Sequence, residues 1–173
     1  MANIVTDLIE AGGGAQRPEL LVIHAMGENI RITEPYKTSR GVVIPPGEYP
    51  AHEWLKLLGI SAHYLLHPDG HFTKCRHTDL IAWHAKDFNT NSVGIEVLVE
   101  GVYTYEEFLE QIKTDWVKPA QYSSLLELGS EIYNWWEMKD LKRHSDLSPG
   151  RKYDPGTGFK WDWFREKFYR RIR

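Results

Sequence analysis

Two short apolar segments, rich in branched residues, limit the folds open to this chain more than any other feature. The segments "LLVIHAM" (20–26) and "SVGIEVLVEG" (92–101) have the length and composition of strands buried in a sheet. Segments with helical spacing lie between and after them. Strands interleaved with helices indicate an α/β or α+β protein, in which a central sheet is covered by helices.

Four segments have the apolar spacing of helices, and several carry helix end signals. Thr104 stands where a capping side chain is expected, Gly59 where a helix ends, and Pro119 in a first turn. In the last segment apolar residues recur at helical spacing, as expected of a helix docked on a core. The predicted helices span 51–59, 104–112, 118–138 and 158–172.

A run of histidines in the segment 61–76 allows two interpretations. His63, His67 and His71 recur every four residues, which on a helix would place three imidazoles on one face as a metal site. The turn sequence "PDG" at 68–70 lies between them, and a helix would not continue through it. We therefore predict a β-hairpin with its turn at 68–70 and reject the helical triple-histidine site.

The segments at the N-terminus and after the first strand show no clear period. We predict that residues 1–19 form a flexible lead-in and that residues 27–50 wrap the surface. The length of 173 residues suits one domain with a core of its own, so we predict a single domain over 1–173.

Composition excludes several classes of protein. Hydrophobic residues make up 42% of the chain, which argues against disorder, and the formal net charge of -3 argues against a nucleic-acid partner. Cys75 is the single cysteine, which excludes internal disulfides and multi-cysteine metal sites. No apolar run approaches the roughly 20 residues that span a bilayer, so we expect no stable membrane insertion.

The loop "HSDLSPGRKYDPG" (144–156) is unusually well determined for a surface connection. Its prolines each fix one backbone angle, and its glycines allow turns that other residues resist. One interpretation is a solvated loop between helices. The other is that the loop aims His144 and Asp154 at one point, such as a metal ion, with Lys152 close by.

The two apolar strands contain the polar residues that could complete such a site. His24 lies near the end of the first predicted strand, and the carboxyl ends of strands are where α/β sheets commonly place sites. With His144 and Asp154 it would supply the three protein ligands of a catalytic zinc site, although each could also be structural. Glu96 interrupts the other strand. It either faces solvent or acts as a general base in a partly dry cleft.

Four blocks of the sequence resemble, in the same order, those of the type-2 N-acetylmuramoyl-L-alanine amidases. The blocks are "LVIHAM", "SAHYLLHPDG", "IAWHAKDFNTNSVGIEVLVEG" and "HSDLSPGRKYDPGTGFKW". This family contains cytosolic anhydro-muropeptide amidases, phage lysins and the peptidoglycan-recognition proteins. The resemblance covers roughly residues 20–165, and the combination of "AWHA…N…SVGIE" with "HSD…SPGRK…DPG" is specific.

The resemblance implies a fold and a set of site residues. The fold is an α/β fold with a central mixed β-sheet flanked by helices and a zinc-containing groove on one side. His24, His144 and Asp154 are implied as the ligands of one zinc ion per chain. Glu96 matches the catalytic carboxylate of the family, and Lys152 matches the basic residue that faces the scissile carbonyl.

The resemblance also suggests residues that contact the substrate. His84 in "AWHA" matches a groove residue near the substrate, and we expect Trp83 and Tyr64 to contact the substrate as well. If Glu96 is not the base, Tyr64 or His84 is the alternative.

The chain departs from many members of the family at three places. A second His or a Tyr, followed by Thr, often comes after the first ligand, whereas this chain has Ala25 and Met26. Many lysins and recognition proteins have a catalytic Tyr where this chain has Ala62, which leaves the base role to Glu96. Asp154 stands where the same groups have Cys, and both features are similar to the recycling branch.

The implied reaction is zinc-dependent hydrolysis of the amide between N-acetylmuramic acid and L-alanine in peptidoglycan. A peptidoglycan-binding module without turnover and a zinc peptidase that cuts within the stem peptide are alternatives. Asp154 is a competent ligand, which favours the enzyme. We expect peptidoglycan or a soluble muropeptide as the partner and a monomer in solution.

The biological setting is predicted from weaker signals. The N-terminus has no basic n-region and no apolar h-region, so we expect synthesis in the cytoplasm without a signal peptide. A phage-type lysin would then reach the cell wall through a holin pore, whereas a recycling amidase would stay in the cytoplasm. The Ala25-Met26 departure and the basic C-terminus favour a single-domain lysin, and Asp154 with Glu96 favours recycling.

Overall fold

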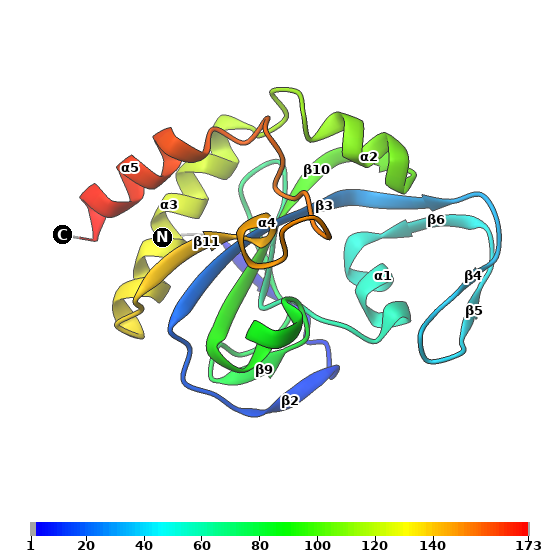
Figure 1. The fold of residues 1–173 in the computed structure, drawn as a ribbon, viewed down its shortest axis with the longest axis horizontal. Helices are drawn as coiled ribbons and strands as arrows, with labels where there is room; N and C mark the ends of the chain where they lie inside the picture. The colour runs from blue at the N-terminus through cyan, green and yellow to red at the C-terminus, as the bar shows by residue number, and fades with distance from the viewer. Residues whose placement is uncertain (1–2, 173) are drawn as a thin grey trace.

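The computed structural model describes residues 3–172, and its two longest strands lie side by side at the centre of a mixed sheet (Figure 1). They are β3 (Leu20–Ile32) and β10 (Ser92–Tyr103), which pair in parallel. The sheet also contains β1 (Ile4–Thr6), β6 (Gly47–Pro50), β7 (Tyr64–Leu66), β8 (Phe72–Lys74) and β11 (Asp140–Arg143). The order is β1-β8-β7-β10-β3-β11, with β6 paired to the far end of β3. The predicted central mixed sheet is confirmed.

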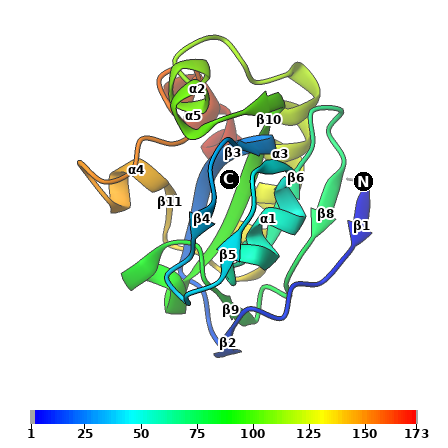
Figure 2. The ribbon, with the colours of Figure 1, turned by 90° about the vertical axis from the view of Figure 1, so that its right-hand side faces the viewer.

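The sheet combines parallel and antiparallel strand pairs. β7 and β8 form an antiparallel hairpin, as predicted, and β3 pairs with β6 in the same way. The other pairs are parallel. Figure 2 shows β1 and β8 at one edge and β11 at the other, beside the short helix α4 (His144–Leu147).

The alternation of side chains along β10 separates the core from the functional face. Val93, Ile95 and Val97 belong to the main core, which lies under the helices α3 (Pro119–Trp135) and α5 (Trp161–Arg171). Leu98 belongs to a smaller core on the other face, under α1 (Ala51–Leu58). Successive strand residues point to opposite faces, so Gly94 and Glu96 lie on the α1 face, as the sequence pattern predicts.

The helices begin and end close to the predicted positions. Thr104 lies just before α2 (Tyr105–Gln111), and its side-chain oxygen accepts a hydrogen bond from the backbone N–H of Glu107. In return, the Glu107 carboxylate accepts a hydrogen bond from the backbone N–H of Thr104. This reciprocal pair satisfies two N–H groups at the start of the helix. Gly59 ends α1 with φ 67°, in the left-handed region that favours glycine.

The prediction of a flexible lead-in over residues 1–19 is wrong for the described part of that segment. β1 pairs in parallel with β8, and β2 (Gly12–Ala15) pairs with β9 (Leu80–Ala82). The buried guanidinium of Arg76 donates to the carbonyls of Ile9, Glu10 and Gly13. These long-range hydrogen bonds order the segment, and a local sequence pattern does not show them.

The segment 27–50 is also more regular than predicted, and we call it the arm. β3 continues to Ile32, turns, and returns as β6 in an antiparallel pair. Between them β4 (Tyr36–Lys37) and β5 (Val43–Ile44) form a second small hairpin. Polar residues and prolines at the turns hide the strand pattern in this part of the sequence.

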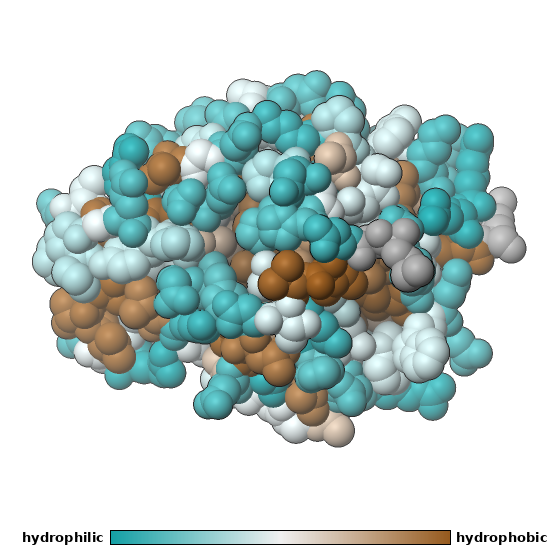
Figure 3. All heavy atoms as spheres, turned by 180° about the vertical axis from the view of Figure 1, so that it is seen from behind, coloured by the Kyte–Doolittle hydropathy of each residue, from teal (hydrophilic) through white to brown (hydrophobic). Residues whose placement is uncertain are grey.

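Two short elements complete the described part of the chain. The 3-10 helix η1 (Lys86–Asn91) leads into β10, and α4 opens the segment 144–156, where the sequence analysis expected only a loop. None of the described helices has the length and apolar character needed to cross a membrane. The face seen in Figure 3 is mostly hydrophilic, with separate apolar patches.

The docking of α5 gives a first prediction. The Phe168 ring is fully buried and packs against Tyr133 and Phe164, so Phe168→Ala should lower the free energy of unfolding by about 3–5 kcal/mol. The exposed neighbour Lys167 gives a matched control, because Lys167→Ala should change the free energy of unfolding by less than about 0.5 kcal/mol. Urea unfolding measures both, and equal effects would show that α5 does not contribute to the core.

Candidate metal centre

The register between the two central strands places a histidine beside a carboxylate. Glu96 in β10 is the direct partner of His24 in β3, so both side chains point to the same face of the sheet. Glu96 Oε1 lies 3.8 Å from His24 Nδ1. His24 lies in the middle of β3, and not near its end as predicted, because the arm extends the strand to Ile32.

The end of β11 brings the second histidine to the same place. β11 pairs with β3 up to the pair Arg143 and Ile23, which is one residue before His24. At His144 the chain leaves the strand and begins α4. The Arg143 guanidinium donates to the Asp146 carboxylate at 2.7 Å and so holds this first turn. His144 Nδ1 thereby lies 2.9 Å from His24 Nδ1.

The loop 144–156 returns to the same point with a carboxylate. The Asp154 carbonyl accepts from the Ser145 N–H at 3.0 Å, which ties the end of the loop to its start. Asp154 Oδ2 lies 3.0 Å from His144 Nδ1 and 3.5 Å from His24 Nδ1. The structure therefore brings together His24, His144 and Asp154, all three of them buried.

The triangle of donor atoms fits a tetrahedral metal ion. Its sides are 2.9, 3.0 and 3.5 Å. Ligand atoms about 2.0–2.1 Å from a zinc ion at tetrahedral angles would lie about 3.3–3.4 Å apart. Two imidazoles and one carboxylate are also a donor set that zinc accepts. These three residues could hold a metal ion with little movement of their side chains.

The protonation of His24 and Asp154 is favourable for a cation. Burial, followed by the nearby His144, lowers the pKa of His24 to about 4. Burial alone would raise the pKa of Asp154, but the hydrogen bond from His144 and the interaction with the nearby His24 hold it well below its usual range. The imidazole of His24 is thus neutral and the carboxylate of Asp154 is ionised at neutral pH.

Glu96 has a different environment from Asp154. Burial and the negative charge of Asp154 raise the pKa of Glu96 to about 8, and the positive charge of Lys152 opposes that shift. Glu96 Oε2 is buried and makes no hydrogen bond with the described residues. A cation bound in the triangle would lower this pKa again, because an opposite charge favours the ionised form.

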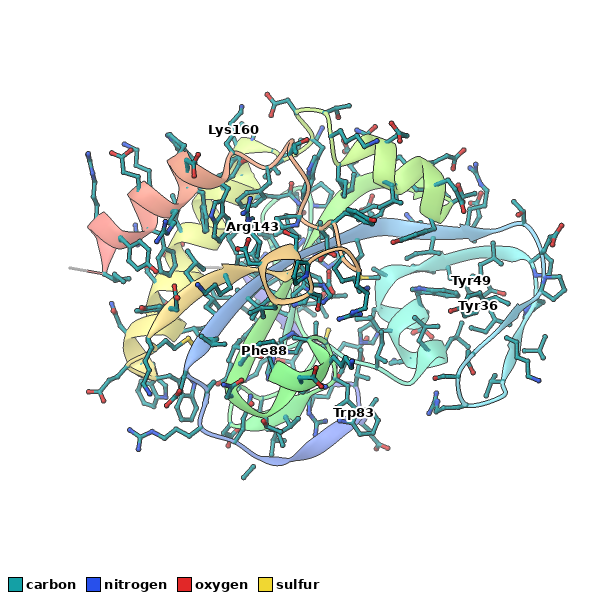
Figure 4. The ribbon with its side chains drawn as sticks, viewed as in Figure 1. Tyr36, Tyr49, Trp83, Phe88, Arg143 and Lys160 are labelled. Atoms are coloured by element: carbon teal, nitrogen blue, oxygen red, sulfur yellow. The ribbon has the colours of Figure 1, made fainter. Side chains whose placement is uncertain are left out.

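A groove of about 720 Å³ opens from the metal centre along β3 to the arm. Lys152 lines it beside Glu96, and Trp83 and His84 line it on the η1 side. Figure 4 shows Trp83 below the 144–156 loop. Tyr36, on the arm, lies to the right of the same loop. Tyr36 packs against Trp54 of α1, with ring centroids 5.6 Å apart. The predicted groove residues His84 and Trp83 therefore lie where a substrate could reach them.

The prediction that Tyr64 contacts the substrate is not supported by its position. Tyr64 in β7 pairs with Ile95 of β10, so it points to the α3 face, away from Glu96. Its ring packs edge-on against Phe72 and is only 6% exposed. Neither substrate contact nor the alternative role as base is open to a side chain in the core.

Sequence analysis did not foresee how closely His84 approaches the metal centre. His84 Nδ1 lies 2.9 Å from His24 Nε2, and the ring of His63 packs edge-on against the other side of His84. Burial, followed by the charge of His24, holds the pKa of His84 well below its usual value. The "AWHA" block marks His84 in the sequence, but its contact with His24 depends on the tertiary fold.

Comparisons with known proteins show the family of this chain. A sequence model of the family described as N-acetylmuramoyl-L-alanine amidase matches residues 14–157. The chain belongs to this amidase family. It is 29% identical over 132 residues to the 1,6-anhydro-N-acetylmuramyl-L-alanine amidase AmpD of Escherichia coli (strain K12), a match that covers 70% of this chain. AmpD of Haemophilus influenzae is 32% identical over 130 residues, or 69% of this chain.

The matched part of this chain spans about two thirds of the length of the AmpD relatives. The match spans 66% of the E. coli relative and 64% of the H. influenzae relative. The amidase LysC of Clostridium intestinale has a similar structure, with a TM-score of 0.67 and 23% identity over 98% of this chain and 99% of the other. A crystal structure of an AmpD derivative has a TM-score of 0.65 and 24% identity, over 96% and 93%. These structures show a shared fold.

Proposed function

We propose that this chain hydrolyses the amide bond between the lactyl group of N-acetylmuramic acid and the L-alanine of the stem peptide. The observation that carries the proposal is the triangle of His24, His144 and Asp154, with Glu96 beside it in a groove. Membership of the amidase family supports the reaction type. The expected partner is peptidoglycan or a soluble muropeptide, and we propose that the chain acts as a monomer.

Zinc is the metal that we propose for the triangle. His24 and His144 would bind it through Nδ1 and Asp154 through Oδ2, because these are the atoms that converge. Three protein ligands would leave room for a water molecule or the substrate on the ion, as in catalytic zinc sites. Bound there, zinc supplies Lewis acidity toward the scissile carbonyl and the attacking water.

Glu96 is the general base in this proposal. Its Oε2 has no hydrogen-bond partner among the described residues, so it is free to accept a proton from the attacking water. The same carboxyl can then give that proton to the nitrogen of the leaving L-alanine. Burial raises the pKa of this carboxyl and a nearby cation would lower it, so the two effects oppose each other.

Lys152 stabilises the negative charge that develops on the carbonyl oxygen. It lies on the 144–156 loop, two residues before Asp154, and lines the same groove as Glu96. A fixed positive charge at this point favours the tetrahedral species over the planar amide. His84 and Trp83 lie on the η1 side of the groove, where we propose that they contact the substrate.

The setting that we propose is a single-domain phage-type lysin that acts on intact cell wall. The support is the length of the groove, which continues past the metal centre to Tyr36 on the arm and Trp54 on α1 and could hold a long polymer. The alternative is a cytoplasmic recycling amidase that acts on anhydro-muropeptides. Its support is the 27–32% identity to curated AmpD proteins, which the lysin proposal does not explain.

The metal assignment predicts one zinc ion per chain. A chelator should abolish hydrolysis and added Zn²⁺ should restore it, while His24→Ala or Asp154→Ala should remove both the metal and the activity. The exposed His77 offers a matched control, and His77→Ala should keep the zinc. Elemental analysis measures the zinc content per chain, and active protein without a transition metal would contradict the assignment.

The base assignment predicts a loss of rate without a loss of metal. Glu96→Gln keeps the shape of the side chain but cannot accept the proton, so kcat should fall by about 10²- to 10⁴-fold at full zinc content. Lys152→Met should lower kcat by about 10²-fold. Lys160 lies on the outer surface near Asp115, and Lys160→Met should leave kcat unchanged. A Glu96→Gln variant with full activity would show that the base lies elsewhere.

The proposed setting predicts a substrate preference. The purified protein should release soluble fragments from intact sacculi and clear permeabilised Gram-negative cells. Mass spectrometry should show glycan with a free lactyl group and an uncut stem peptide. Many-fold faster cleavage of anhydro-muropeptides without clearing would support recycling, shortened stem peptides would indicate a peptidase, and intact muropeptides would indicate a binding module.

A further inference from the structure

A chain of hydrogen bonds leads from the ring of His24 to a backbone carbonyl on η1. His24 Nε2 lies 2.9 Å from His84 Nδ1, and His84 Nε2 lies 3.2 Å from Ser92 Oγ. Ser92 Oγ lies 2.6 Å from the carbonyl oxygen of Phe88. Figure 4 labels Phe88 on η1, close to the 144–156 loop. The chain starts on the side of the His24 ring that faces away from Asp154.

The last acceptor of this chain sets the direction of every bond in it. A carbonyl oxygen can only accept, so the Ser92 hydroxyl donates its one proton to Phe88. The Ser92 oxygen must then accept from His84, which places the ring proton of a neutral His84 on Nε2. His84 Nδ1 is left with a bare lone pair, so His24 donates to it from Nε2.

We infer that His84 and Ser92 are positioning residues that hold His24 in the tautomer with its proton on Nε2. In this tautomer the Nδ1 lone pair points into the triangle with His144 and Asp154. The ligand atom is therefore ready before any ion binds, and no proton has to leave Nδ1. This inference rests on the metal centre of the proposed function, but the tautomer itself is a property of the metal-free protein.

The position of His84 is held by two further features. A Cβ atom at Gly94 would lie 2.4 Å from His84 Nδ1, so the glycine in β10 leaves the space that the ring occupies. The Asn89 side-chain oxygen accepts from the backbone N–H groups of His84 and Ala85, at 2.9 and 2.6 Å. The same side chain thus ties the loop that carries His84 to the η1 turn that carries the Phe88 carbonyl.

The inference distinguishes a hydrogen-bonding role of His84 from a packing role. His84→Phe keeps the ring but removes the acceptor for His24 Nε2–H. His84→Asn loses much of the ring but can place an amide oxygen near the position of Nδ1. A packing role ranks the Phe variant first in zinc affinity, whereas the positioning role ranks the Asn variant first.

The test has two measurements, made on the wild type, on both His84 variants and on Ser92→Ala. Nitrogen NMR of the metal-free protein should show His24 with its proton on Nε2 in the wild type and a mixture of tautomers in His84→Phe. Competition with a chromophoric chelator should show zinc affinity about 10- to 100-fold lower in His84→Phe. The loss should be smaller in His84→Asn, and His77→Phe, at an exposed histidine, should have no effect.

The outcomes separate this inference from the proposed function. A wild type that binds no zinc contradicts the metal centre, while the NMR measurement still decides the tautomer. A wild type that binds zinc and a folded His84→Phe variant with equal affinity overturns the inference, as does a His24 proton on Nδ1. If His84→Phe does not fold, Ser92→Ala decides the matter. It frees His84 to carry its proton on Nδ1, so an unchanged His24 tautomer there also overturns the inference.

Discussion

The in-register parallel pairing of β3 with β10 is the constraint on which the candidate site depends. It makes His24 and Glu96 direct neighbours on one face while the alternate residues of both strands fill the main core. A shift of either strand by one residue would turn its polar side chain under α3 and α5 and turn its core residues to the opposite face. The apolar face of β10 thus fixes the site as well as the fold, because the register that buries it is the one that builds the site.

The remaining parts of the centre are attached to this pair of strands. β11 pairs with β3 and ends one residue before the level of His24, which lets His144 turn over the sheet. The loop then brings Asp154 back to the triangle, held by its bond to Ser145. On the opposite side, Gly94 of β10 makes room for His84, which contacts the far nitrogen of His24. Each ligand is therefore positioned by the backbone of a strand or by a loop that begins on one.

The sequence predicts the parts of this structure that have a local signal. The alternation along β10, the capping residue Thr104 and the loop rich in Pro and Gly each have one, and those predictions agree with the structure. The strands at the N-terminus depend on hydrogen bonds from Arg76, more than 60 residues away, and have no local pattern. Likewise, the face to which Tyr64 points is decided by its pairing with β10, and the contact of His84 with His24 by the tertiary fold.

The coordination of zinc is the central claim, and X-ray absorption at the zinc edge tests it most directly. In protein loaded with one equivalent of zinc, we predict two imidazole nitrogens, one carboxylate oxygen and one further light atom, all about 2.0–2.2 Å from the ion. A sulfur ligand at about 2.3 Å, or a shell with a single imidazole in the wild type, would contradict the account.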